Sequence, residues 1–209
     1  MSRAQIPLAG GGQESLLSEV GSQYLLPRFT TREACALRLV CREFLAAVTD
    51  QPWDDRYTVI LGSIEAWRAC FPRALAANVR QDIFPNWTRK APVVDADFVH
   101  FEGLRELDMG ECRSVSDAAF AHLRGIQALN MNGCRQRGIT DAAFAHLRGI
   151  HTLSMSECRQ PTITDAAFAH LRGIHWLDMA GCAQSTITDA APARHPHAGH
   201  VLLQPGGHH

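Results

Sequence analysis

The sequence predicts an α/β fold: a repeat solenoid with parallel strands inside and helices outside, preceded by a small all-helical module. One observation is a segment of the form apolar-x-x-Leu-x-Met-x-x-Cys that occurs four times, at Leu104–Cys112, Ile126–Cys134, Ile150–Cys158 and Ile174–Cys182. Another is a block related to ITDAAFAHLRG that separates these copies. A third is an apolar helical pattern at Glu33–Val48, upstream of the repeats.

The composition is that of an ordinary globular chain and argues against several classes of protein. Of the 209 residues, 46% are hydrophobic and 20% charged, and the formal net charge is -1. There is no basic excess that would indicate a nucleic-acid partner, and no apolar stretch approaches the roughly 20 residues that span a bilayer. Seven cysteines without a signal-peptide pattern indicate free thiols in a reducing compartment, so we expect a cytoplasmic or nuclear protein.

The first block of each repeat predicts a short strand. Leu107 and Met109 alternate with polar residues, so both side chains point to one side of the strand, and the other three copies have the same pattern. The second block predicts a helix, because a Ser or Thr precedes an Asp at its start as an N-cap residue. These N-caps are Ser116, Thr140, Thr164 and Thr188. One unit cannot bury its apolar face alone, whereas stacked units share a continuous core.

A diverged copy, VDADFVHFEG, begins at Val94, so the predicted repeats cover residues 94–191. The whole pattern resembles the cysteine-containing class of leucine-rich repeats. The resemblance implies a right-handed arc with a parallel sheet on its concave face and helices outside. The concave face is the usual partner surface of that family, so its variable positions are the expected contacts with an unknown target protein. They are Glu106, Asp108, Glu111, Asn130, Asn132, Thr152, Ser154, Glu157, Trp176 and Asp178.

Trp176 is the strongest anchor candidate among these, because aromatic residues dominate binding hot spots. The alternative is that it lies near a frayed end of the array.

Two other residue types, Cys and His, recur at one position of each repeat, and each has a structural alternative to a metal site. The repeated Cys predicts buried packing rather than a metal ladder, and the repeated His, at positions 100, 122, 146 and 170, predicts a solvated stripe rather than a pH sensor. We therefore expect no metal or other cofactor.

Residues 1–13 are a predicted disordered leader, and residues 14–56 a predicted helical module. The helix at Glu33–Val48 is apolar nearly all round and therefore needs burial on several sides. About 40 residues cannot supply that burial, so the module needs a partner surface. Residues 57–93 connect it to the repeats and predict an irregular first repeat, with a helix at Ile64–Cys70 and a strand near Leu75–Val79.

The helical module resembles an F-box. The matching residues are LRLVCREF, Leu37 to Phe44, followed by Trp53, with Leu16 to Glu19 at the opening, where Leu17 replaces the usual Pro. The resemblance implies docking on Skp1, and the implied contacts are Leu17, Val20, Leu26, Leu39, Val40, Cys41, Phe44 and Trp53. The alternative is a helical cap on the solenoid that binds nothing.

After Ala191 the repeat would continue FAHLRGI, but the chain reads PARHPHAGHVLLQPGGHH. Permitted codons for these residues, read one base later, encode LRGIHTLDMSYCNQAGIT, which is the missing repeat. The sequence therefore predicts a frameshift after Ala191 and an unstructured, out-of-frame tail at residues 192–209. The array would then end without a cap, and an otherwise monomeric chain could self-associate at the open sheet edge.

These features predict a protein-binding chain rather than an enzyme, because no nucleophile–base set, phosphate loop or metal spacing is present. The two resemblances together imply the substrate receptor of a Skp1–cullin–F-box ubiquitin ligase. The alternatives are a repeat scaffold or decoy that does not engage the ligase, and a non-functional truncated product.

The codons from Pro192 onward test the frameshift prediction. Sequencing the gene should show that reading them one base later continues the repeat, with a net loss from the parental repeat not divisible by three. A stop codon or an unrelated peptide in that frame would contradict the prediction.

Overall fold

The computed structural model describes residues 26–81, 91–182, 184–188 and 200–202. The chain divides into two units, Met1–Gln51 and Pro52–His209. The boundary lies after Gln51 rather than after the predicted residue 56. The segment predicted to connect the two parts therefore belongs, in its described portion, to the same unit as the repeats.

The described part of the first unit, residues 26–51, contains a 3-10 turn, η2 (Leu26–Arg28), and two helices, α2 (Thr31–Leu37) and α3 (Arg42–Asp50). A capping box begins α2: the Thr30 side chain accepts from the backbone N–H of Glu33, and the Glu33 carboxylate accepts from the backbone N–H of Thr30 at 2.9 Å. This arrangement fixes the start of α2 two residues before the predicted helix.

The prediction of one helix over Glu33–Val48 is wrong, because the chain leaves the helix between α2 and α3. Leu39 and Val40 donate to the carbonyls of Ala36 and Leu37, three residues back, which tightens the last turn. Cys41 is then fully extended, with φ -158° and ψ 169°, and begins α3 without a side-chain cap. The break takes the side chains between the helices out of the helical pattern and leaves them accessible to solvent.

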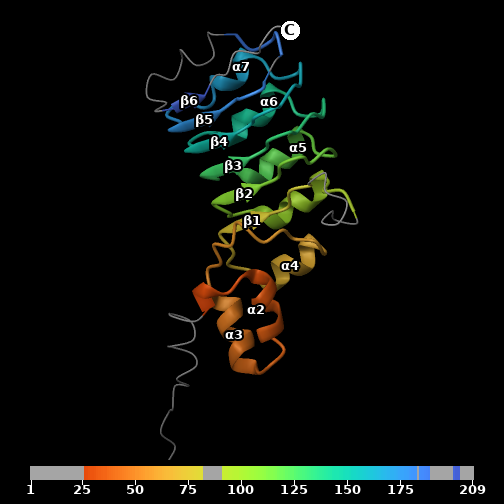
Figure 1. Cartoon of the computed structure of the whole chain (residues 1–209), viewed down its shortest axis with the longest axis vertical. Helices are drawn as coiled ribbons and strands as arrows, with labels where there is room; N and C mark the ends of the chain where they lie inside the picture. Colours follow the sequence, from red (N-terminus) through yellow and green to blue (C-terminus); the bar gives the residue numbers. More distant parts are fainter. Residues whose placement is uncertain (1–25, 82–90, 183, 189–199, 203–209) are drawn as a thin grey trace, which may run out of the picture. The chain divides into compact units, whose positions relative to one another are not determined.

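The second unit begins as the sequence predicted, with a helix, α4 (Ile64–Cys70), and a strand, β1 (Ala76–Asn78). A 3-10 helix, η3 (Asp95–Phe101), follows and corresponds to the diverged repeat. The remaining strands are β2 (Glu106–Asp108), β3 (Ala128–Asn130), β4 (Thr152–Ser154), β5 (Trp176–Asp178) and β6 (His200–Leu202). All six strands pair in parallel and in chain order, which confirms a parallel-strand repeat (Figure 1).

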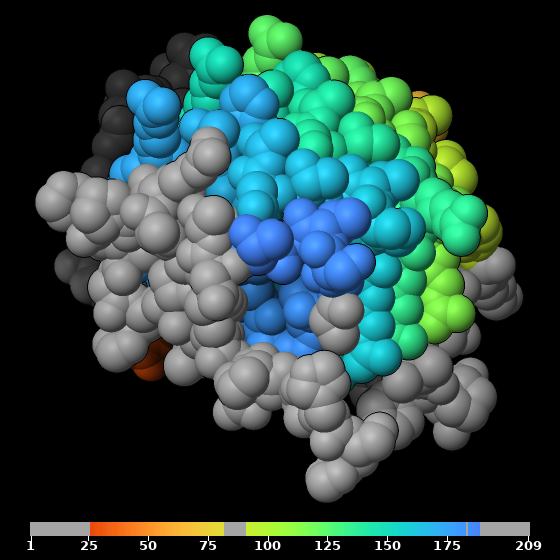
Figure 2. All heavy atoms as spheres, turned by 90° about the horizontal axis from the view of Figure 1, so that it is seen from above, coloured from red at the N-terminus to blue at the C-terminus, as the bar shows by residue number. Residues whose placement is uncertain are grey.

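The helical blocks are shorter than a regular helix. Each is one α-helical turn followed, in the first two, by a 3-10 turn: α5 (Asp117–Phe120) with η4 (Ala121–Leu123), α6 (Asp141–Phe144) with η5 (Ala145–Leu147), and α7 (Asp165–Phe168). These helices lie on one side of the unit and the strands on the other (Figure 1). The view along the stack shows the last described repeat in blue, with earlier repeats in cyan and green behind it (Figure 2).

Rows of identical side chains form the core between sheet and helices. The strands are in register, so that Leu107, Leu129, Leu153 and Leu177 follow one another across the sheet, all at most 2% exposed. Phe120, Phe144 and Phe168 form the matching row on the helices and are fully buried. Burial of one such side chain contributes about 1.5–3 kcal/mol, so the repeated rows supply most of the stability of this unit.

The repeated cysteines form another buried row, as the sequence predicted. Cys112, Cys134 and Cys158 are buried and Cys182 is half-buried. The Cys158 thiol donates to the carbonyl of Met131 in the preceding repeat at 3.1 Å, and the Cys182 thiol to that of Met155 at 3.0 Å. Burial raises the pKa of the Cys134 thiol to about 12 and that of Cys182 to about 11. These thiols therefore stay protonated and join each repeat to the one before it.

The first residue of each helical turn binds the next repeat. Asp141 starts α6, and its two carboxylate oxygens accept from the backbone N–H and the hydroxyl of Thr164, each at 2.7 Å. The same paired bonds join Asp95 to Ser116, Asp117 to Thr140, and Asp165 to Thr188. We call each of these pairs of hydrogen bonds a clasp. Three of these clasps hold the N-cap residues of α5, α6 and α7, which are Ser116, Thr140 and Thr164, so these clasps join each helix to the one before it.

The prediction of an unstructured tail is wrong for residues 200–202. These residues form β6, with the Cα atom of Val201 opposite that of Leu177 of β5. The edge of β5, where the sequence predicted possible self-association, is therefore paired with β6, which is the terminal strand of the sheet. A parallel ladder joins backbone groups only, so an unpaired edge can take up an extended segment of almost any sequence. The remaining tail lies outside the described residues, and the frameshift stays a prediction.

We predict that Asp141→Ala lowers the free energy of unfolding by about 2 kcal/mol, because it leaves the amide and hydroxyl of Thr164 without their charged acceptor. Asp141→Asn should lose less, since one acceptor oxygen remains. Urea denaturation at unchanged m-value measures both effects. Glu157→Ala on the surface is the control and should stay within about 0.5 kcal/mol of the parent. Equal effects of Asp141→Ala and Glu157→Ala would show that the clasp does not hold the repeats together.

Candidate protein-interaction site

A groove of about 450 Å³ crosses the open face of the parallel sheet, the face turned away from the helices. It belongs entirely to the second unit. We call it the sheet groove; it is lined by Arg56, Tyr57, Ala77, Asn78, Glu106, Leu107, Asp108, Ala128, Leu129, Asn130, Thr152, Ser154 and Trp176. The residues at the start of each strand, Ala76, Glu106, Ala128, Thr152 and Trp176, lie in one register row. All of them except Ala76, which is buried, line the groove and set its depth. The small Ala128 lies at the middle of this row, between longer side chains.

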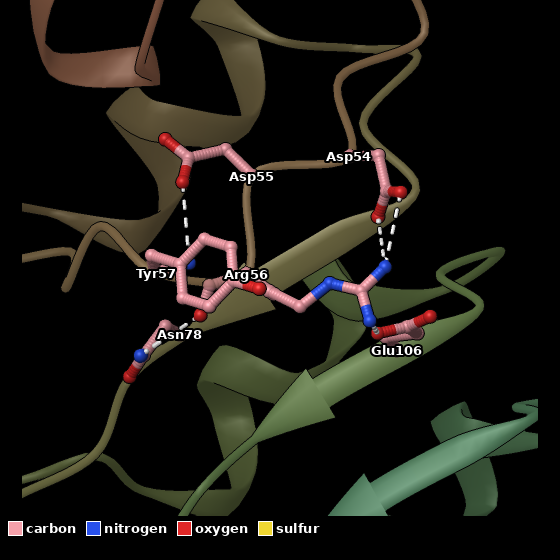
Figure 3. Close-up of polar contacts among 6 residues, drawn as sticks. All are labelled: Asp54, Asp55, Arg56, Tyr57, Asn78 and Glu106. Atoms are coloured by element: carbon pink, nitrogen blue, oxygen red, sulfur yellow. Dashed lines mark hydrogen bonds and ion pairs between the residues drawn. The ribbon is translucent and has the colours of Figure 1, made fainter.

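Tyr57 marks one end of the groove and is 83% exposed. The segment that carries it is held by backbone turns rather than by packing. The Asp55 carboxylate accepts from the backbone N–H groups of Tyr57 and Thr58, at 3.2 and 3.1 Å. The Asn78 side-chain amide donates to the carbonyl of Arg56 at 3.1 Å (Figure 3). These bonds fix Tyr57 beside the first strand, although its ring itself stays accessible.

Arg56 fastens this segment to the second strand. Its guanidinium lies between two carboxylates, 3.1 Å from Asp54 and 2.9 Å from Glu106 (Figure 3). The side chains of Arg56 and Glu106 are 45% and 30% exposed, so the ion pair is partly screened and contributes little to stability. Its main consequence is geometric, because it holds the Tyr57 segment over β1 and β2.

Trp176 marks the other end of the groove. It is half-buried, and its strand pairs with β4 on one side and with β6 on the other. The tryptophan is therefore placed within the sheet and not at a frayed end, which was the alternative that the sequence left open. Two aromatic rings at opposite ends of one row give the groove a defined length.

Asn, Asp and Ser side chains at the ends of the strands form a second row, and many of their polar atoms are already used. Asp108 and Asp178 each accept from the backbone N–H two residues ahead, at 2.9 and 3.0 Å. Asn130 donates to the Asp108 carboxylate at 3.1 Å. Asn132 accepts from the hydroxyl of Ser154 at 2.7 Å. These side chains mainly cap the ends of the strands and orient one another. Only the polar atoms that these hydrogen bonds leave unused can contact a partner.

Glu111 and Glu157 lie in the loops after the strands, outside the groove. Both have left-handed backbones, with φ of 59° and 56°. The matching positions of the alternate repeats are Gly133 and Gly181, with φ of 68° and 71°. A Cβ on Gly133 would clash with the carboxylate of Glu111. Each glutamate thus covers the glycine of the next repeat, and the loop geometry explains both residue types.

The outcome for the predicted concave face is mixed. Glu106, Asp108, Asn130, Thr152, Ser154 and Trp176 line the groove, whereas Glu111, Asn132, Glu157 and Asp178 do not. Arg56 and Tyr57, which also line the groove, were not predicted from the sequence. The only signal for them was a charged and aromatic segment, DDRY, before an irregular first repeat, and nothing in that segment showed that it would lie against the sheet.

The residues predicted to contact Skp1 fall into three groups. Leu39 and Val40 are 89% and 67% exposed in the turn between α2 and α3, with Cys41 exposed beside them and Phe44 half-buried. Leu26 is buried, with an exposed fraction of 1%. Leu17 and Val20 lie outside the described residues.

Trp53 belongs to the second unit instead. It is 3% exposed and packs edge-on against Phe71, with ring centroids 5.5 Å apart. Its carbonyl accepts from the backbone N–H of Leu75 at 2.7 Å. The burial corrects the expectation that its side chain is a surface contact: its ring completes the core beside β1.

No three His, Cys, Asp or Glu side chains of the described residues come together as a metal ion would require. Of the repeated histidines, His122 contacts Glu102 at 2.7 Å. Among the helices of the described ranges, none is long and apolar enough to cross a membrane.

No family model matches the chain, and no curated protein sequence matches it. Among solved structures, the chain is similar to one described as "Crystal structure of Rad7 and Elc1 complex in yeast", with a TM-score of 0.44 and 17% sequence identity. The alignment covers 62% of this chain and 32% of that chain, so this chain spans about a third of the neighbour's length.

Proposed function

We propose that the protein is a protein–protein interaction module whose second unit holds a partner in the sheet groove. The observation that carries this proposal is the groove itself, about 450 Å³ in volume, with the exposed Tyr57 at one end and Trp176 at the other. Aromatic residues dominate the energetics of protein interfaces, because they bury a large area at a small cost in conformational entropy. The interlocked strands beneath them form a rigid base, which limits the entropy lost on binding.

The polar groups of the groove favour binding over catalysis. Tyr57, Thr152 and Ser154 bring hydroxyl groups to the groove; that of Ser154 donates to Asn132, and no histidine is among the residues that line the groove. A serine nucleophile needs an adjacent general base. The proposed contribution of this chain is therefore to hold a partner and not to transform it.

The finer proposal is that the chain is the substrate receptor of a Skp1–cullin–F-box ubiquitin ligase. Two features support it: the LRLVCREF segment, which resembles an F-box, and the exposure of Leu39 and Val40 within that segment. Two apolar side chains in an exposed turn are costly in water and are typical of a surface that a partner covers. The groove would then hold a target near the ubiquitin-loaded enzyme, and the rate gain would come from proximity.

A repeat scaffold that does not engage the ligase is the second candidate. The observation that favours it is the burial of Leu26 and Trp53, since two of the expected adaptor contacts are then unavailable at the surface. The two candidates differ in whether the first unit binds Skp1, and both keep the groove as the partner site.

We predict that the full chain co-purifies with co-expressed Skp1 and that Val40→Asp abolishes this association, because the interface would bury an unpaired carboxylate. Val40 is 67% exposed, so the change should leave the fold intact. Trp176→Ala in the second unit is the control and should bind Skp1 like the parent. Equal Skp1 binding by Val40→Asp, or no binding by the parent, would favour the scaffold.

The groove has its own test. Proteins recovered with the full chain from its native cells should be depleted at least tenfold by Tyr57→Ala or Trp176→Ala, the loss expected for a hot-spot residue. Arg148→Ala, an exposed change outside the groove, should leave recovery unchanged. Recovery that is insensitive to both aromatic changes would place the binding site elsewhere.

A further inference from the structure

We propose that the sheet groove selects an extended, positively charged segment of its partner, about seven residues or longer. This inference rests on the proposed function, since it names the chemistry of what the groove holds. It uses three properties of the described residues: their charge, their spacing across the sheet, and the aromatic rings at the two ends.

Carboxylates outnumber basic side chains among the residues that line the groove, with Glu106 and Asp108 against Arg56. Among the described residues, Arg56 is the one basic side chain that lines it, and Asp54 and Glu106 lie 3.1 and 2.9 Å from its guanidinium. Asp108 also lines the groove, and Asp178 lies 3.4 Å from the hydroxyl of Ser154, a lining residue. The charge of Arg56 is thus compensated locally, and the field over the remaining groove favours a cationic side chain.

The two aromatic ends set the length of the occupant. Val59 pairs in parallel with Asn78, which places Tyr57 beside Ala76, in the row that continues through Glu106, Ala128 and Thr152 to Trp176. The row therefore takes five steps between the aromatic residues, or about 24 Å at about 4.8 Å per step. An extended chain advances about 3.4 Å per residue, so about seven residues reach from one ring to the other.

The aromatic rings suit the same occupant. A Lys or Arg side chain that lies over the face of Tyr or Trp is attracted by the ring, and its carbon stem buries apolar surface against it. The floor between the rings is low at Ala128, where a chain can approach the sheet closely. An acidic or phosphorylated segment meets the opposite situation, because its charge adds to that of Glu106 and Asp108. Charge and shape therefore point to the same class of ligand.

The chain supplies a matched pair of variants for the test. Glu106 and Glu157 each pair with one arginine, at 2.9 and 2.8 Å, but only Glu106 lines the groove. Glu106→Gln and Glu157→Gln therefore change the net charge equally and each break one ion pair. Asp108→Asn is a second groove variant, and its fold is safe because Asn occupies the matching positions 78 and 130.

The probe is a random library of displayed 12-residue peptides, selected on the full chain. Enriched peptides should be rich in Lys and Arg and poor in Asp and Glu. Measured individually by fluorescence anisotropy, they should bind at least fivefold more weakly to Glu106→Gln and to Asp108→Asn. Binding to Glu157→Gln should stay within twofold of the parent, and binding to the parent should weaken as salt is raised.

Enrichment of acidic or uncharged peptides, equal effects of Glu106→Gln and Glu157→Gln, or no enrichment at all would overturn the proposal. Tyr57→Ala and Trp176→Ala separate this failure from that of the proposed function. If uncharged or acidic peptides are selected but still need both rings, the groove binds proteins and only the charge selectivity is wrong. If the selected peptides bind regardless of both rings and both carboxylates, the groove is not the binding site and the proposed function fails as well.

Discussion

The clasp between neighbouring repeats is the interaction on which the rest of the second unit depends. The Asp at the start of each helical turn accepts two hydrogen bonds from the Ser or Thr that caps the next helix, as Asp117 does from Thr140 and Asp141 from Thr164. The cap residue in turn accepts from an amide of its own helix, for example that of Ala142. The same network of hydrogen bonds therefore starts each helix and holds neighbouring repeats together. A helix of a single α-turn would not form alone, so its stability comes from this network and from packing.

The clasps and the parallel ladder place each repeat position in a row. Rows that face the core keep one residue type, as Leu and Cys do, because the same space must be filled at every step. The outward row from Glu106 to Trp176 is free of that constraint and differs at every strand. The groove therefore takes its shape from the different sizes of the side chains in this row, where the small Ala128 lies between larger neighbours. The scaffold fixes where side chains lie, and the outward row decides what they can hold.

The sequence predicts the features that depend on local periodicity. The strands of the repeats, the buried Leu, Met and Cys, and the N-cap residues Ser116, Thr140 and Thr164 follow from spacing, and the structure confirms them. It also confirms α4 and β1. Features that depend on contacts between residues far apart in the sequence could not be predicted from spacing. The Asp141 carboxylate accepts from Thr164, 23 positions away in the sequence. Asn78 and Glu106, which help to hold the Tyr57 segment beside the groove, are also far from it in the sequence. Where one continuous helix was predicted, turn geometry at Arg38–Cys41 breaks the chain into two helices. Where an unstructured tail was predicted, His200–Leu202 pairs with the edge of β5.

Site-specific photo-crosslinking in native cells tests the central claim most directly, namely that the open face of the sheet is the partner surface. A benzophenone side chain would replace Tyr57 or Trp176 in the groove and, for comparison, the exposed Ala142 or Ala166 on the helices. The account predicts discrete crosslinked adducts from both groove positions, with the same partner identified by mass spectrometry at each, and little product from the helix positions. Adducts that form mainly from Ala142 and Ala166, with none from the groove, would contradict it.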